Sequence, residues 1–144
     1  MNIVVDTNIV FSTLLNPRSS IGEILMNIQD QFKFFAPELL KEELNRYAQK
    51  ISASSKLNNS DLAVVKELLF SNISFVSEEL ISKRSWAEAY ALTKDVDEDD
   101  TPFIALAIEL HTALWTGDKV LREGLTKKGS AIIISTGDLK RQLK

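Results

Sequence analysis

The chain contains no cysteine, three prolines, five glycines and a single histidine. Without cysteine there are no disulfides, no thiolate metal sites and no cysteine nucleophile, a composition that fits a reducing cytosol. The one histidine, His111, follows a helix that we predict to end near Leu110, where a cation is favourable at the negative end of the helix dipole. We therefore predict a structural role for His111, and the carboxylates are the candidates for catalytic residues.

Long apolar runs are also missing from the sequence. No stretch is long enough to cross a bilayer, and the first residues, Met1–Asp6, lack the basic region and the apolar length of a signal peptide. We therefore expect a cytoplasmic protein with no membrane segment. With 144 residues, 44% of them hydrophobic and 26% charged, the chain is expected to form one globular domain over residues 1–144.

The net charge of −3 argues against a general nucleic-acid binder, but the charges are unevenly distributed. Residues 117–144 carry seven basic and three acidic side chains, so this segment is positive and the remainder is negative. A basic end beside an acidic centre can hold a phosphate backbone next to a metal ion. A solvated charged surface is the plainer interpretation, and the charge pattern alone leaves both open.

Short apolar runs alternate with amphipathic stretches along the chain. Strands are predicted at residues 2–6, 32–35, 73–76, 112–115 and 131–135. Helices are predicted at residues 7–15, from a Ser19 or Ser20 cap to Asp30, then at 37–51, 60–70, 77–93 in one or two pieces, 101–110, 119–125 and 138–144. Pro37 is predicted to begin its helix, residues 52–59 to form a loop, and Ser60 to cap the following helix. The alternation predicts an α/β fold in which helices cover both faces of a mostly parallel sheet.

Three acidic residues stand where a predicted strand ends or a predicted helix begins. Asp6 closes the first strand, Asp118 follows the strand at 112–115, and Asp100 opens the helix at 101–110. In an open α/β sheet, ligands bind outside the carboxyl ends of the strands. Carboxylates that converge there repel one another unless a cation lies between them, and a sulfur-free, oxygen-rich ligand set suits Mg²⁺ or Mn²⁺. The sequence therefore predicts a metal-dependent site for phosphoryl transfer.

A fourth carboxylate lies on the core-facing stripe of the helix predicted at 37–51. Leu40, Glu43, Leu44 and Tyr47 share one helical face, with spacings of three, four and seven residues. A carboxylate in such a position is unfavourable unless it is paired, protonated or bound to a cation. Glu42 lies on another face, toward water, so Glu43 is the residue that we predict to belong to the site.

Helix capping is the competing explanation for each of these acids taken singly. Their coincidence at the ends of strands and helices favours a site. Within the acidic run at residues 95–100, Asp97 lies one turn before Asp100, and we predict that it reaches the same metal ion or a second one. A calcium loop does not fit this run, because no glycine stands at the sharp turn and no glutamate follows at the required spacing.

Four segments together resemble the PIN-domain ribonucleases, including the VapC-like toxins of toxin–antitoxin pairs, along nearly the whole chain. The matching segments are residues 3–8, 36–44, 97–107 and 114–118. The resemblance implies an acidic site made of Asp6, Glu43, Asp100 and Asp118, with Asp97 as an additional metal ligand. It also implies that two polar residues, Asn8 and Thr116, belong to this site.

The same resemblance implies a fold and a function. The fold would be an α/β/α sandwich around a short, mostly parallel sheet. The cofactor would be Mg²⁺ or Mn²⁺, and the reaction would be attack of water on an RNA phosphodiester without a covalent enzyme intermediate. The partners implied are RNA, an antitoxin protein and a second copy of the chain in a homodimer.

Two other functions stay open at this point. A non-catalytic PIN-like domain that binds RNA or protein as a regulator would have the same fold, although the presence of all four acids favours catalysis. A phosphoryl-accepting, receiver-type domain also gathers aspartates at strand ends. It requires an acceptor aspartate after a central strand and a lysine after a late strand, whereas the strand at 73–76 is followed by Ser77 and the strand at 131–135 has no lysine at its end.

Overall fold

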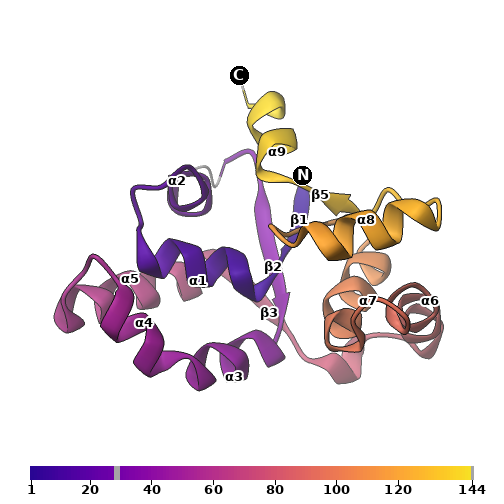
Figure 1. Ribbon diagram of the computed structural model, residues 1–144, viewed down its shortest axis with the longest axis horizontal. Coiled ribbons are helices and arrows are strands. Elements are labelled where there is room, and N and C mark those ends of the chain that lie inside the picture. Colours follow the sequence, from indigo (N-terminus) through magenta and orange to yellow (C-terminus); the bar gives the residue numbers. More distant parts are fainter. Residues whose placement is uncertain (28–29, 144) are drawn as a thin grey trace.

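A five-stranded sheet with the strand order β3-β2-β1-β4-β5 forms the centre of the protein (Figure 1). The structure is a computed structural model that describes residues 1–27 and 30–143. The strands are β1 (Asn2–Val5), β2 (Lys33–Pro37), β3 (Ile73–Val76), β4 (Ala113–Trp115) and β5 (Ile133–Ile134). All neighbouring strands are parallel, as the alternation of strands and helices predicts.

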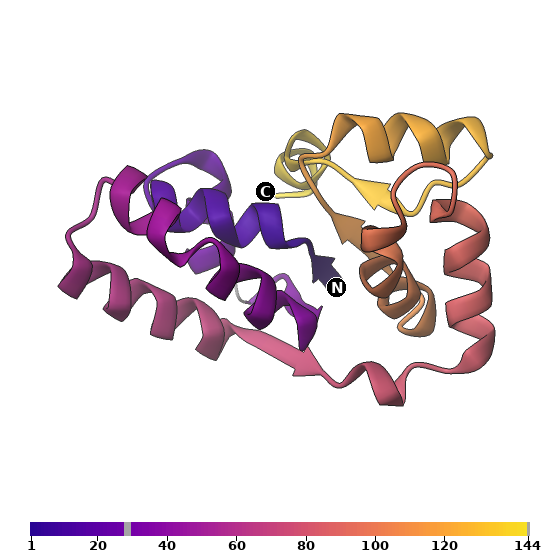
Figure 2. The same ribbon diagram turned by 60° about the horizontal axis from the view of Figure 1, so that its bottom comes forward.

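Helices cover both faces of this sheet. They are α1 (Thr7–Leu15), α2 (Ser20–Asn27), α3 (Leu39–Arg46), α4 (Ala48–Ser54), α5 (Asn59–Asn72), α6 (Lys83–Thr93), α7 (Thr101–Glu109), α8 (Lys119–Lys127) and α9 (Thr136–Gln142), with 3₁₀ turns η1 (Glu78–Leu80) and η2 (Glu98–Asp100). Figures 1 and 2 show α1 to α5 on one side of the sheet and α6 to α8 on the other, so the predicted α/β/α sandwich is confirmed. Among the described residues, no helix has the length and apolarity needed to span a membrane.

The core strand β1 lies between β2 and β4, and the direction of chain winding reverses there. The chain first builds β2 and β3 on one side of β1 and then returns to build β4 and β5 on the other. A crevice at the carboxyl ends of the strands beside such a switch point is the usual ligand site of an open α/β sheet. Asp6 directly follows β1, and its N–H donates to the Trp115 carbonyl at 3.0 Å. The fold therefore places Asp6 at the switch point.

The strand order also decides against one alternative function. Receiver domains have the flavodoxin-like order 2-1-3-4-5, with the third strand beside the first. Here β3 lies at the edge of the sheet and pairs with β2. The receiver-type alternative is therefore wrong.

The predicted helix over residues 37–51 is wrong in its start and in its continuity. Pro37 is the last residue of β2, beyond the part that pairs with β1, so its missing N–H breaks no bond to that strand. The helical region is divided into α3 and α4 at Tyr47, whose N–H donates to the Leu44 carbonyl at 3.1 Å in a tighter turn. The first free N–H of α3, at Leu39, is capped from a distant element by the Glu78 carboxylate at 2.6 Å. Local sequence patterns carry no sign of that long-range cap.

Two capping predictions have opposite outcomes. The Ser19 cap is confirmed, since its hydroxyl accepts a hydrogen bond from the Gly22 N–H at 3.1 Å. The Ser60 cap is wrong, because the Asn58 side chain accepts from the Asp61 N–H at 2.8 Å and starts α5 earlier. The predicted loop at 52–59 is also too long, because α4 continues to Ser54.

The remaining boundaries differ by a few residues. The second strand is longer than predicted at its carboxyl end, β5 keeps only two residues, and α9 begins before Asp138. The helix predicted to run to Asp30 passes through residues 28–29, which lie outside the described residues, and Asp30 itself lies in a turn. The predicted end of the last helix, at residue 144, also lies outside the described residues.

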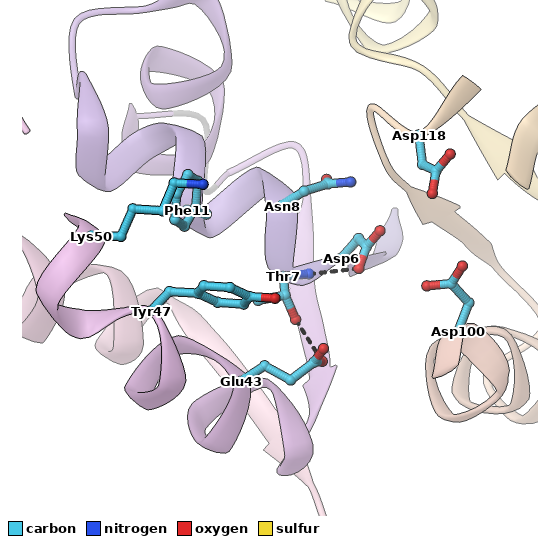
Figure 3. A pocket seen from close by; sticks show the side chains of 9 residues that line it. All are labelled: Asp6, Thr7, Asn8, Phe11, Glu43, Tyr47, Lys50, Asp100 and Asp118. Atoms are coloured by element: carbon cyan, nitrogen blue, oxygen red, sulfur yellow. Dashed lines mark hydrogen bonds between the residues drawn. The ribbon is translucent and has the colours of Figure 1, made fainter. Parts of the chain in front are cut away.

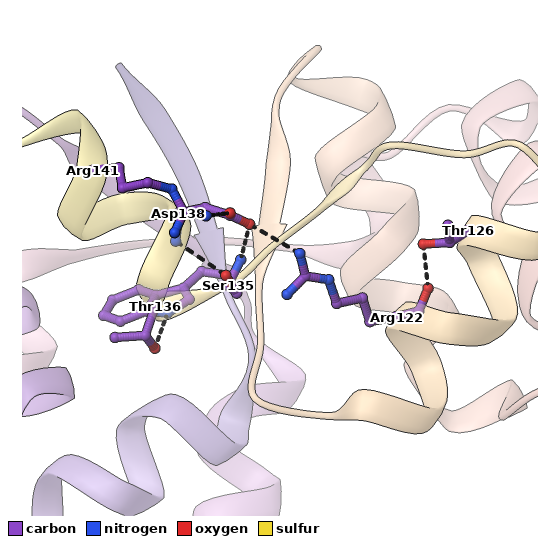
Figure 4. Close-up of polar contacts among 7 residues, drawn as sticks. Arg122, Thr126, Ser135, Thr136, Asp138 and Arg141 are labelled. Atoms are coloured by element: carbon purple, nitrogen blue, oxygen red, sulfur yellow. Dashed lines mark hydrogen bonds and ion pairs between the residues drawn. The ribbon is translucent and has the colours of Figure 1, made fainter.

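The carboxylate of Asp138 fixes the carboxyl-terminal helices to each other (Figure 4). It accepts from the Ser135 N–H at 3.0 Å, while the Ser135 hydroxyl accepts from the Asp138 N–H, which forms a capping box at the start of α9. The same carboxylate forms ion pairs with Arg122 of α8 at 3.4 Å and with Arg141 of α9. Hydrogen bonds from Ser135 are the main reason that the pKa of Asp138 lies below its ordinary value. α8, which follows the switch point, is thereby held in place.

Candidate functional site

A cavity of about 320 Å³ opens at the carboxyl ends of β1 and β4 (Figure 3). The four carboxylates predicted for the site all line it: Asp6, Glu43, Asp100 and Asp118. Figure 3 shows Asp6, Asp100 and Asp118 directed toward one another, with Glu43 farther along the same cavity. The fold thus brings together acids that are up to 112 residues apart in the chain, from Asp6 to Asp118.

One hydroxyl group connects the ends of the two central strands. Thr116, only 3% exposed, follows β4 and donates to Oδ2 of Asp6 at 2.7 Å. The Thr116 hydroxyl oxygen itself accepts from Nδ2 of Asn8 at 3.1 Å and from the Asp118 N–H at 3.1 Å. Asn8 in turn accepts from the Gly117 N–H at 3.4 Å. Asn8 and Thr116, both predicted for the site, therefore position the two aspartates rather than standing apart from them.

Helix capping accounts for only part of the acidic cluster. One oxygen of Asp6 accepts from the Thr7 N–H at 2.7 Å, and one oxygen of Asp118 accepts from the Leu121 N–H at 3.1 Å. Asp100 precedes α7 but makes no capping hydrogen bond. Its Oδ2 atom is buried and has no hydrogen-bond partner among the described residues. A buried carboxylate oxygen without a partner is costly to keep, so capping does not explain Asp100.

Burial and like charge make this cluster hard to ionise. The pKa of Asp100 is raised from 3.8 to about 8, chiefly by burial and then by the negative charges of Asp6 and Asp97. Burial likewise raises the pKa of Asp6, against the opposing hydrogen bond from Thr116. Without a cation, the cluster near neutral pH therefore retains at least one proton on Asp100.

Glu43 and its neighbour Glu42 have different surroundings. Oε1 of Glu43 accepts from the Thr7 hydroxyl at 2.9 Å inside the cavity. Burial raises the pKa of Glu43, the Thr7 hydrogen bond lowers it, and the charge of Asp6 raises it further. Glu42 is exposed and does not line the cavity. The helical-face argument therefore identified the carboxylate that shares the cavity with the other acids.

Asp97 lies at the rim and does not line the cavity. Its side chain accepts from the Asp99 N–H at 3.0 Å and caps η2. Its charge nevertheless contributes to the raised pKa values of Asp6 and Asp100. The structure thus places Asp97 within electrostatic range of the cluster, at an exposed position outside the cavity lining.

The donor atoms of the cavity suit a hard divalent cation. All of the acidic donors are carboxylate oxygens, and the unpartnered Oδ2 of Asp100 supplies a buried acceptor. Within the described residues, no three acidic or histidine side chains surround one point as a closed ligand set. Carboxylate oxygens are the ligands that Mg²⁺ and Mn²⁺ prefer, and a cation among them would offset their mutual repulsion. The residues therefore fit the cofactor predicted from the sequence.

The cavity contains four residues that the sequence did not assign to the site: Thr7, Phe11, Tyr47 and Lys50. Tyr47 was predicted only as part of the apolar stripe that also holds Glu43. Tyr47 lies four residues after Glu43, and Lys50 lies seven residues after Glu43. This spacing is the sequence signal that could have placed Glu43, Tyr47 and Lys50 on one side of the cavity.

We expect Thr116→Val to destabilise the protein because the mutation leaves a buried oxygen of Asp6 without its donor. An unsatisfied buried group of this kind costs about 1–3 kcal/mol. Urea unfolding measures the difference, and Thr116→Ser, which keeps the hydroxyl, is the matched control and should remain close to wild type. Equal stability of the valine and serine variants would show that this hydroxyl does not hold the site together.

The raised pKa of Asp100 gives the metal-free protein a defined pH dependence. The folded state keeps a proton on Asp100 up to about pH 8, whereas the unfolded chain releases it near its ordinary value of 3.8. Stability should therefore fall as the pH rises from about 4 to about 8, because the folded state binds more protons in that window.

Asp100→Asn removes this titration, so its unfolding free energy in chelator should fall less between about pH 5 and pH 8.5 than that of the wild type. Urea unfolding at the two pH values tests this. The same fall in both proteins, or a variant less stable than wild type at the higher pH, would show that Asp100 serves the helix and not the acidic cluster.

Comparisons with known proteins agree with this geometry. A family model for the PIN domain matches residues 4–136. A comparison with curated proteins finds no match. Among solved structures, the chain is similar to the crystal structure of VapBC2 from Rickettsia felis bound to a DNA fragment from their promoter, with a TM-score of 0.66 and 15% identity over 94% of this chain and 98% of that chain. At this identity the likeness shows the fold, and the family model spans most of the sequence, so the chain belongs to the PIN domain family.

Proposed function

We propose that this protein is a metal-dependent nuclease that hydrolyses RNA phosphodiester bonds and is the toxin of a toxin–antitoxin pair. The observation that carries the proposal is the unpartnered, buried oxygen of Asp100 in a cavity lined by three further carboxylates. Membership of the PIN domain family supports nuclease activity. The metal ion and the RNA substrate are our assignment from the chemistry of the cavity.

Asp6, Asp100 and Asp118 would hold the ion, because they point toward one another at the switch point. When bound, a divalent ion polarises a phosphodiester oxygen and makes a nearby water more acidic. Glu43 lies farther along the cavity and would orient the attacking water and accept its proton. Attack on phosphorus then breaks the bond to the leaving oxygen without a covalent link to the protein.

The basic side of α8 supports a polyanionic substrate. This helix begins directly after Asp118, and Lys119, Arg122 and Lys127 line a shallow groove along it. Arg122 forms an ion pair with Asp138 at 3.4 Å, so Lys119 and Lys127 are the cations of the groove that are more available to a ligand. Basic side chains beside the acidic cavity would attract a phosphate backbone toward it.

The proposed partner is an antitoxin protein. The solved structure that shares this fold over nearly its whole length is a VapBC2 complex, and this likeness is the support for the partner. The homodimer expected from the sequence stays a prediction, as does the cytoplasmic location.

Asp6→Asn should abolish cleavage of single-stranded RNA in Mn²⁺ while the fold remains intact. The substitution keeps the shape of the side chain and removes one negative charge from the ligand set. A time course with labelled RNA, run with and without chelator, measures the effect. Asp61→Asn, which alters an exposed aspartate at the start of α5, is the control and should cleave like wild type.

Wild-type cleavage by the Asp6→Asn variant would contradict the assignment of Asp6. Failure of the wild-type protein to cut any RNA in Mg²⁺ or Mn²⁺ would instead favour the regulatory, non-catalytic PIN-like alternative.

Glu43→Gln and Glu42→Gln form a matched pair of neighbouring substitutions. We expect Glu43→Gln to weaken Mn²⁺ binding, because it removes a negative charge from the cavity, and to slow RNA cleavage, because it removes the proposed proton acceptor. Glu42→Gln should leave both unchanged, since Glu42 is exposed on another face of α3. Calorimetric titration with Mn²⁺ gives the two affinities, and the reverse order of effects would overturn the assignment.

A further inference from the structure

The cavity extends past the acidic cluster between α1 on one side and the consecutive helices α3 and α4 on the other. On α1, Thr7 and Phe11 are four residues apart, and on the opposite side Glu43, Tyr47 and Lys50 follow one another at spacings of four and three. Four residues advance about 6 Å along a helix. Figure 3 shows the acids at one end of the cavity and the Phe11 and Tyr47 rings at the other, with the Lys50 ammonium beside the Phe11 ring. The hydrolytic chemistry described above uses none of the aromatic or lysine groups.

The two aromatic rings are arranged as a platform and its support. Phe11 is partly buried and contacts Tyr47 edge-to-face, with ring centroids 5.9 Å apart and an interplanar angle of 81°. Tyr47 itself is 47% exposed. Such an edge-to-face contact restrains the orientation of the tyrosine ring, which lines the cavity and is partly exposed.

Lys50 adds a positive charge at the far end. Its ammonium lies 5.7 Å from the centroid of the Phe11 ring. Among the described residues, no carboxylate forms an ion pair with it. An exposed cation without a carboxylate partner, in a cavity otherwise rich in carboxylates, is available to an anionic ligand.

The cavity has acids at one end and, at the other, an exposed aromatic ring and a cation that has no carboxylate partner among the described residues. These groups match the parts of a nucleotide chain. A phosphate at the acidic end requires the proposed metal ion, a base has the flat surface that stacks on an aromatic ring, and a second phosphate complements Lys50. A scattered exposed tyrosine needs no explanation. Here, however, the ring shares one cavity with the acidic cluster and with the unpaired lysine.

We propose that Tyr47, held in place by Phe11, stacks on an unpaired nucleobase next to the phosphate that is cleaved, and that Lys50 binds the phosphate beyond it. This inference rests on the proposed nuclease function and narrows its substrate to a strand that is unpaired at this position. Stacking on a ring face is tolerant of sequence, because every base has such a face. Tyr47 is therefore a positioning residue that selects strand state rather than base identity.

The test is binding of a short fluorescein-labelled oligouridylate in Mg²⁺, measured by fluorescence anisotropy in the Asp6→Asn background, which is expected to cleave no RNA. Tyr47→Ala and Tyr47→Leu should each weaken binding roughly tenfold, within the range of about 1–3 kcal/mol found for one stacked base. Tyr47→Phe should restore it. The leucine variant keeps apolar packing without an aromatic face, so it separates stacking from a general loss of structure.

Two controls match these variants elsewhere on the protein. Tyr90 is 49% exposed and lies outside the cavity, so Tyr90→Ala should bind like the parent. Lys50→Gln should reduce the dependence of log affinity on log salt by about 0.7, the value for one phosphate contact with a single strand. Lys66→Gln, which alters a lysine at a similar distance of 5.6 Å from the Phe70 ring, should leave that slope unchanged.

A second probe is a blunt duplex RNA of comparable length, which offers no unpaired base. Tyr47→Ala should leave its affinity unchanged. Equal losses on single strand and duplex, or no loss on either, would overturn the proposal. Because binding is measured without cleavage, its outcome is independent of the nuclease assay: a wild-type protein that cuts no RNA refutes the proposed function, whereas unaltered binding by Tyr47→Leu refutes the stacking platform.

Discussion

Repulsion among carboxylates at the ends of β1 and β4 is the constraint on which the rest of the site depends. Asp6 and Asp100 are held in a cavity where burial raises the pKa of both, and poorly screened negative charges raise them further, that of Asp6 acting on Asp100 and that of Asp118 acting on Asp6. The chain does not relieve this with its own cations. Among the described residues, the ion pairs lie elsewhere and none involves Asp6, Asp100 or Asp118. A carboxylate cluster that is neither paired with cations nor fully hydrogen-bonded is stable only when it binds protons or an external cation.

The sheet is built to tolerate such a cluster. Its central strand is apolar on both faces, with Ile3, Val4 and Val5 fully buried, so the position of Asp6 is fixed by the core rather than by the polar groups around it. The Thr116 hydroxyl then joins the end of β1 to the end of β4. Two parallel strands with a rigid core beneath them hold the acids together at a switch point, where the helices on either side leave a crevice. Acidic groups on rigid strand ends can be kept close despite their repulsion.

Much of this arrangement could be predicted from the sequence, because the signals are local. Three buried aliphatic residues before Asp6 identify the first strand, and the helical face identifies Glu43 over Glu42. Contacts between distant segments could not be predicted. Two of the three hydrogen bonds of Thr116, to Asp6 and from Asn8, depend on β1 and β4 being neighbours. The break of the helix at Tyr47 shows no local breaker in the sequence. The predicted core-facing stripe contained Leu40, Leu44 and Tyr47. Leu40 and Leu44 are buried in the core, whereas Tyr47 lines the cavity, and the sequence did not predict this.

The central claim is that these carboxylates bind one divalent ion, and anomalous diffraction from crystals soaked in Mn²⁺ tests it most directly. The account predicts a manganese peak between Asp6, Asp100 and Asp118, with the buried Oδ2 of Asp100 among its ligands. A well-ordered cavity without such a peak at saturating Mn²⁺, or a peak only at sites away from these three side chains, would contradict it.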